Sequence, residues 1–78
     1  MELVEIGNRV KRAYSKVVDI KDVVDVVPFI FRSTKGYTVW TKTKETIETI
    51  SGYEAAAGNK VQEIKQNGEY YTLFIKVS

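Results

Sequence analysis

Cysteine and histidine are absent from this 78-residue chain, and their absence excludes much of the side-chain chemistry available to small domains. Without thiols the chain forms no disulfide, and without thiolate or imidazole ligands it lacks the usual zinc sites. The common nucleophile pairs of hydrolases, in which Ser or Cys stands beside His, are excluded for the same reason.

The 10 acidic residues leave one catalytic route, a carboxylate pair. They lie on polar helical or turn segments, where no apolar pocket is expected to raise a carboxyl pKa. Asp19, Asp22 and Asp25 recur at every third position, whereas a calcium loop needs alternate acids and a central glycine. Glycines never cluster, so no phosphate-binding loop is present. We therefore expect a protein that is not an enzyme and has no metal and no cofactor.

Long apolar runs are also lacking. The longest is Val26–Phe31, which contains the only proline, whereas a membrane span needs about 20 residues. No basic region precedes an apolar run near the N-terminus, so we expect no secretory signal. The absence of cysteine fits a reducing compartment. These features predict a cytoplasmic protein outside the membrane, with one domain over residues 1–78. A core this small supplies only about 3–5 kcal/mol, so stabilisation by homodimer formation stays open at this point.

The N-terminal third supports two interpretations. Apolar residues recur three or four positions apart over residues 3–27, which is typical of a helix. Asn8 is a good N-cap and predicts a helix from there to about residue 18. Asp19 or Asp22 would cap a second short helix that ends before Pro28. The many valines favour strands instead, and this alternative assigns strands to residues 16–20 and 23–27.

Residues 28–44 predict a β-hairpin, because aromatic and β-branched residues flank Thr34-Lys35-Gly36. Those three residues suit a loop whose glycine takes a left-handed conformation. The resulting register pairs Phe31 with Val39 and Ile30 with Trp40. One strand face then carries Phe29, Phe31, Tyr37 and Val39. The other carries Ile30, Arg32, Thr38, Trp40, Lys42 and Lys44.

The following segment predicts a short helix over residues 52–57. Ser51 with Glu54 three positions later forms a capping box, three alanines favour a helix, and Gly58 is placed to end it. Residues 43–50 remain open between strand and helix.

Asn67-Gly68 is the strongest hairpin signal in the chain and joins residues 60–66 to 69–77. The predicted pairing sets Ile64 opposite Tyr71. One face of this hairpin is expected in the core and carries Ile64, Tyr71, Leu73, Ile75 and Val77. The opposite face is half apolar and carries Val61, Tyr70 and Phe74.

Together these elements predict an α+β fold. An N-terminal helix accompanies an antiparallel sheet of about four strands in two hairpins, with a short helix between the hairpins. The alternative is a small, partly open five-stranded barrel whose first strand comes from residues 16–27. Its order of elements resembles that of the oligonucleotide-binding fold in topology alone.

Positive charge and aromatic residues coincide in the first hairpin. The net charge is only +2, but residues 26–44 contain four cations and no acid. Bases stack on aromatic rings while cations neutralise phosphates, so the pattern predicts nucleic-acid binding, to a single strand or to duplex DNA, by a small regulatory protein. The candidate residues are Arg32, Lys35, Trp40, Lys42 and Lys44. The alternative for Trp40 is a core position, with the lysines as charges that protect an edge strand.

A second hypothesis is a protein-binding inhibitor or adaptor. Its candidate surface is the half-apolar face with Val61, Tyr70 and Phe74, which a partner or a second copy would cover. A weaker candidate for phosphate contact is the basic segment with Arg9, Lys11, Arg12 and Lys16, whose other interpretation is a solvated helix face.

Overall fold

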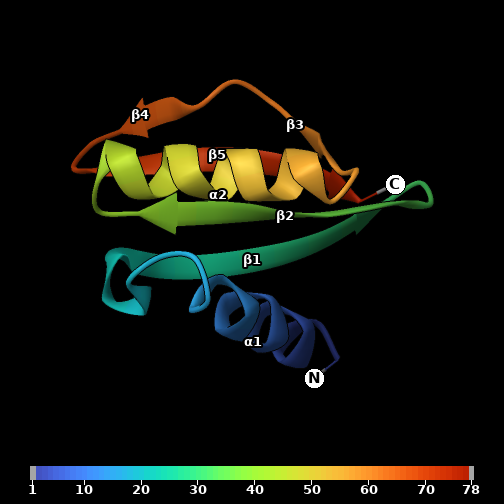
Figure 1. Ribbon diagram of the computed structural model, residues 1–78. Helices are drawn as coiled ribbons and strands as arrows, with labels where there is room; N and C mark the ends of the chain where they lie inside the picture. The colour runs from blue at the N-terminus through green and yellow to red at the C-terminus, as the bar shows by residue number, and fades with distance from the viewer. Residues whose placement is uncertain (1, 78) are drawn as a thin grey trace.

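Two hairpins follow one helix each in the computed structural model, which describes residues 2–77 (Figure 1). The elements in order are α1 (Glu2–Tyr14), the 3-10 helix η1 (Ile20–Asp22), β1 (Val23–Phe31), β2 (Thr34–Thr41), α2 (Lys44–Ala56), β3 (Lys60–Val61), β4 (Lys65–Asn67) and β5 (Tyr70–Val77). The expected α+β class is confirmed, with an N-terminal helix, a helix between two hairpins and an antiparallel sheet.

The sheet has five strands, in the order β1-β2-β5-β3, with β4 also paired to β5. β3 and β4 share the edge of β5 that lies away from β2, so β1 and the β3–β4 segment form opposite edges. Within residues 2–77 these edges do not pair with each other and the sheet does not close, so the alternative of a small, partly open five-stranded barrel is wrong. Figure 1 shows α2 lying along β2 and β5, and α1 lying beside β1.

Both helices contribute to one core on the same face of the sheet. Val39, Leu73 and Ile75 point toward the helices and are completely buried. The helical side chains packed in the same cluster are Tyr14 from α1 and Ile47 and Ile50 from α2. Burying a side chain of this size contributes about 1.5–3 kcal/mol, so this cluster is a major source of packing energy.

The first hairpin has a different register from the expected one. Its turn is Arg32-Ser33, where both residues have positive φ values of 47° and 67°, and Phe31 pairs with Thr34. A two-residue turn with two left-handed residues matches the twist of the strands. The predicted loop over Thr34-Lys35-Gly36 and the predicted partners of Phe31 and Ile30 are therefore wrong, because these residues belong to the paired strands.

This change of register moves residues between faces. Trp40 now lies opposite Asp25, and Thr38 lies opposite Val27. The shift is by an odd number of positions, so Phe29 and Phe31 share a face with Trp40 rather than with Val39.

The helices begin earlier than the sequence pattern predicts. α1 starts before Asn8 and ends at Tyr14, whereas Asp19 caps η1 by accepting a hydrogen bond from the Lys21 amide at 3.0 Å. Residues 23–27 form a strand, as the valine-based alternative predicts, and residues 16–20 do not. α2 starts after Thr43, whose hydroxyl accepts from the Thr46 amide at 3.2 Å, so the predicted cap at Ser51 is wrong.

The C-terminal hairpin keeps its predicted faces. Its turn lies one position later, with Asn67 paired to Tyr70, and this even shift of register leaves each side chain on its side. Leu73 and Ile75 are buried as expected, Ile64 and Tyr71 pack at the border of the core, and Val77 is exposed. Val61 is the exception, because the chain leaves β5 between β3 and β4, and Val61 pairs with Ile75 on the core face.

Among the described helices, none has the length and apolar character required to cross a membrane.

Candidate nucleic-acid interface

The sheet face opposite the helices is rich in aromatic rings. On β2 the buried Val39 points to the core, so its neighbours Thr38 and Trp40 point to the other side. In the part of the chain described here, no helix covers this second face, which we call the open face. Strand pairing assigns to it Val27, Phe29, Phe31, Thr38, Trp40, Tyr70, Thr72 and Phe74.

Phe29 and Phe74 form the centre of the open face. Their ring centroids are 4.5 Å apart and the ring planes differ by 24°, which is a stacked pair. They come from β1 and β5, so the contact spans β2 at Gly36. A Cβ atom on Gly36 would lie 2.6 Å from the Phe29 ring and 2.0 Å from the Ile75 carbonyl oxygen. Glycine in mid-strand therefore provides the space for this pair.

A second aromatic pair lies at the other end of β2. The Trp40 and Tyr70 ring centroids are 6.4 Å apart at an interplanar angle of 75°. Trp40 is half-buried, and 37% of Tyr70 is exposed. The indole is therefore neither sealed in the core nor free in solvent.

Near the first turn, Phe31 is the most accessible ring of the open face, with 64% of its surface exposed. The Arg32 guanidinium carbon lies 5.2 Å from its ring centroid, which is a cation–π contact. A guanidinium beside an accessible ring can meet both a phosphate and a base.

Cations border the open face on the side of β5. Lys60 pairs with Lys76, and Lys65 pairs with Thr72, so strand pairing directs all three lysines to this side. Of the described strand residues on this face, Asp25 alone is acidic, and its carboxylate already accepts from the Val26 amide at 2.9 Å. The face thus combines aromatic rings with an excess of positive charge.

The five residues predicted to bind nucleic acid are not all brought together. Arg32 and Trp40 adjoin the open face, whereas Lys35 points to the helix side, since it pairs with Val77. β2 ends at Thr41, so Lys42 lies in the following loop and Lys44 begins α2. The predicted alternation of Trp40, Lys42 and Lys44 along one strand is therefore wrong.

The residues of the second hypothesis divide in a similar way. Tyr70 and Phe74 lie on the open face, while Val61 packs against the core. Sequence reasoning missed Phe29 and Phe31 because the register was wrong. It missed Lys60 because β3 and β4 are separate segments. The sequence did offer one signal, which is the run of three apolar residues directly after Pro28. In a strand such a run places apolar side chains on both faces.

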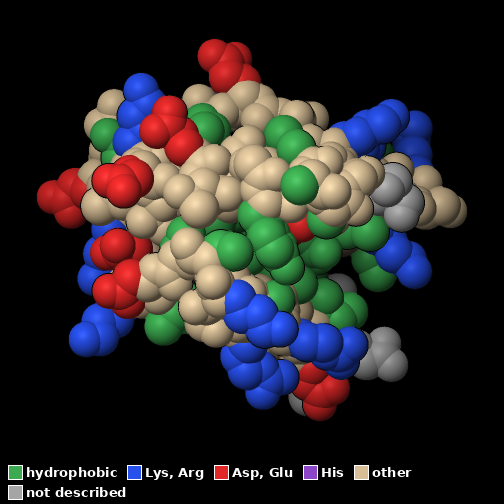
Figure 2. Space-filling model, in the orientation of Figure 1, with side chains coloured by type: hydrophobic (Ala, Val, Ile, Leu, Met, Phe, Trp, Pro, Cys, Tyr) green, Lys and Arg blue, Asp and Glu red, His purple; other side chains and the backbone are tan. Residues whose placement is uncertain are grey.

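The basic segment of α1 lies on the helix side of the molecule. Figure 2 shows Lys and Arg side chains gathered over α1, and Arg9 and Arg12 are exposed. This surface is separate from the open face because α1 packs from the core side.

One acidic residue is buried, contrary to the expectation from sequence. Only 5% of Glu54 is exposed, and its Oε2 accepts from the Tyr14 hydroxyl at 2.6 Å. Asn59 Nδ2 donates to Oε1 at 3.1 Å. Burial, followed by the hydrogen bond to Glu54, raises the pKa of Tyr14. Oε2 thus joins α2 to α1, and Oε1 joins the end of α2 to the segment that follows it.

Comparison of the chain with protein-family models, with curated proteins and with solved structures finds no match.

Proposed function

We propose that this protein binds single-stranded nucleic acid on the open face, as a non-catalytic regulatory protein of the cytoplasm. The observation that carries the proposal is an uncovered sheet face with accessible aromatic rings and lysines along one border. Unpaired bases would stack on the rings while lysine side chains neutralise phosphates.

A single strand fits this face better than a duplex. Ring faces contribute only when a base is free to stack, and the bases of a duplex already stack on each other. The rings extend from Phe31 of β1, which pairs with Thr34 at the start of β2, to Trp40 near the end of β2, a span of about 20 Å at strand rise. That length accommodates several consecutive bases rather than one.

Replacement of one accessible ring tests the stacking. Tyr70→Ala should weaken binding of a fluorescein-labelled oligothymidylate by about 5- to 150-fold, the equivalent of one stacked base. Fluorescence anisotropy at low salt measures the affinity.

Tyr53→Ala is the matched control for this experiment. Tyr53 is also 37% exposed and also makes one edge-to-face contact, with Tyr14 at 6.1 Å, but it lies on α2. Tyr53→Ala should therefore leave the affinity for the oligothymidylate unchanged. Equal losses in the two variants would contradict the proposal, and so would the absence of binding by the wild-type protein at low salt.

The lysine border is tested by the salt dependence of the same affinity. Removing one ion pair between a lysine and a phosphate should reduce the slope of log affinity against log salt by about 0.7. Lys65→Gln and Lys76→Gln should each show this decrease, whereas Lys21→Gln on η1 should not. A slope that is unchanged in both border variants would mean that these lysines do not bind phosphate.

Binding to a protein is the second candidate, because 47% of Val27 and 64% of Phe31 are exposed on the open face. Sedimentation of the isolated protein separates the two functions. A monomer that associates only with the oligonucleotide supports the first, whereas a tight homodimer that excludes the oligonucleotide supports the second.

A further inference from the structure

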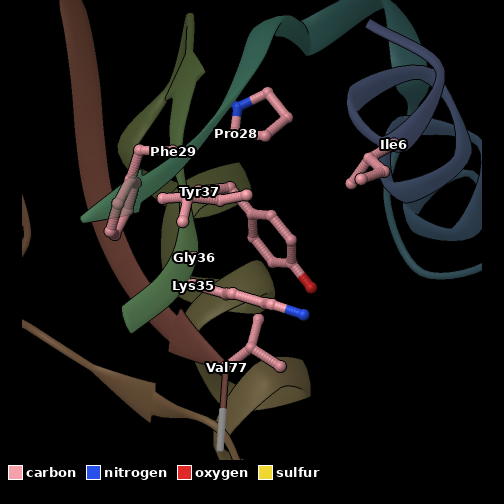
Figure 3. Close-up of a pocket in the computed structure, with 8 residues that line it drawn as sticks. Ile6, Pro28, Phe29, Lys35, Gly36, Tyr37 and Val77 are labelled. Carbon is pink, nitrogen blue, oxygen red and sulfur yellow. The ribbon is translucent and has the colours of Figure 1, made fainter. Parts of the chain in front are cut away.

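A groove on the helix side of the sheet lies apart from the open face. It has a volume of about 330 Å³, and its walls include Ile6 of α1, Pro28 and Ile30 of β1, and Val77 of β5. Figure 2 shows hydrophobic side chains between α1 and the strands in this region, and Figure 3 shows the groove in close-up. The volume lies within the range of small-molecule sites, about 300–1,000 Å³.

The groove exists because the helices diverge from this part of the sheet. α2 packs on β2 and β5 through Ile47 and Ile50, whereas α1 contacts β1 near Gly7. The end of the sheet near the Arg32-Ser33 turn is left uncovered between them. Ile30 is therefore 60% exposed although it points to the helix side.

Two polar side chains from β2 enter this apolar groove. Lys35 and Tyr37 are two positions apart and so point to the same face. Figure 3 shows the Lys35 amino group and the Tyr37 hydroxyl directed the same way, into the space beside Val77. No carboxylate is among the described residues that line the groove. Burial, followed by the charge of Glu54, raises the pKa of Tyr37, so its hydroxyl stays protonated and can donate.

We infer that the groove binds a small amphiphilic carboxylate, with its apolar chain along Ile6, Ile30 and Val77 and its carboxylate beside Lys35. The ammonium supplies the charge that selects an anion, and the Tyr37 hydroxyl supplies a hydrogen bond. The apolar walls supply most of the affinity. The ligand is a free monomer in solution, because the groove admits one narrow chain rather than a lipid surface.

Chain length and head group test this inference separately. Octanoate, below its micelle concentration, is added to 15N-labelled protein, and two-dimensional NMR monitors the amides of the groove. Affinity should rise about fourfold per methylene from hexanoate to octanoate, as expected for apolar burial. Octanol and octylamine should bind at least twofold more weakly than octanoate. Equal affinity for octanol and octanoate would overturn the role of Lys35, and no shift in the groove with any of the ligands would overturn the site.

Lys35→Gln isolates the charge. It should weaken octanoate binding by about two- to fivefold, the range of an exposed ion pair, and leave octanol binding unchanged. Lys42→Gln, in the loop at the far end of β2, is the matched control and should change neither affinity. Lys35→Gln should also retain full oligonucleotide affinity, since Lys35 points away from the open face. Unchanged octanoate affinity in Lys35→Gln would contradict the inference.

Discussion

Tyr14 and Glu54 are 40 positions apart in sequence, and the hydrogen bond between them joins the two helices. Both side chains are buried, so neither could lose its partner without a desolvation cost of about 1–3 kcal/mol. Asn59, just after α2, completes the arrangement by donating to the second carboxylate oxygen. At the scale of single residues, this polar cluster fixes how α1 meets α2 above the sheet.

The raised pKa of Tyr14 predicts how stability depends on pH. The unfolded tyrosine ionises near pH 10, whereas the folded one remains protonated at that pH. Stability is therefore fully present below pH ~10 and falls as pH rises above it, by up to about 1.4 kcal/mol per pH unit for one tyrosine. Tyr37 adds to the same trend, because its pKa is also raised.

Tyr14→Phe is the variant that tests this account. It should lose about 1–3 kcal/mol at pH 7, because Glu54 loses a donor, and it should then lose less stability than the wild type between pH 10 and pH 11. Urea unfolding over this pH range gives both quantities. An identical slope above pH 10 in the two proteins would show that Tyr14 is not the titrating group.

The two helices each contain one glycine, and the two glycines have opposite surroundings. α1 approaches β1 so closely at Gly7 that a Cβ atom there would lie 2.7 Å from the Val26 carbonyl oxygen. Gly52 in α2 has no atom within 4 Å of the corresponding position. The first glycine therefore sets the distance between helix and strand, while the second only weakens its helix.

This contrast predicts effects of opposite sign. Gly52→Ala should stabilise the protein by about 0.5–1 kcal/mol through helix propensity. Gly7→Ala offers the same gain but must displace backbone, so we expect a net loss of about 1–3 kcal/mol. Chemical denaturation measures both, and stabilisation by both substitutions would contradict the close packing of α1 on β1.

The start of α2 is decided by Thr43 rather than by Ser51. Thr43→Ala should cost about 1 kcal/mol, the usual effect of losing an N-cap. Ser51→Ala lies within the helix and should change stability by less than about 0.5 kcal/mol. Thermal or urea unfolding distinguishes these outcomes. A larger loss of stability in Ser51→Ala than in Thr43→Ala would favour the shorter helix that the capping-box pattern predicts.

At the scale of the whole molecule, the sequence predicts the α+β class and the core of the second hairpin. Asn67-Gly68 and the alternation that follows it locate Leu73 and Ile75 correctly. The predicted turn and register of the first hairpin are wrong, because the turn is formed by Arg32 and Ser33 in left-handed conformations. Residues other than glycine adopt such conformations uncommonly. In the sequence Gly36 indicates a turn, but in the sheet it lies in mid-strand, where the Phe29 ring and the Ile75 carbonyl oxygen leave no space for a Cβ atom.

The wrong register of the first hairpin also made the prediction of the candidate site wrong. An odd shift of register exchanges the faces of β1 and places Phe29 and Phe31 on the same face as Trp40. The hairpin pattern already places Lys65 and Lys76 on the face of Tyr70 and Phe74. Lys60 joins them only through the pairing of β3 with β5, which differs from the predicted register. The sequence pattern is sufficient to propose Arg32 and Trp40 as binding residues, but it is not sufficient to predict the surface on which they lie.

The most direct measurement of the central proposal is a map of perturbed residues. Two-dimensional 15N NMR is recorded with and without unlabelled oligothymidylate, and the indole N–H of Trp40 gives a signal of its own, since the chain has 1 tryptophan. The account predicts perturbations at Phe29, Phe31, Trp40, Tyr70 and Phe74, with α2 unaffected. Perturbations confined to α1 and α2, or none at low salt, would contradict it.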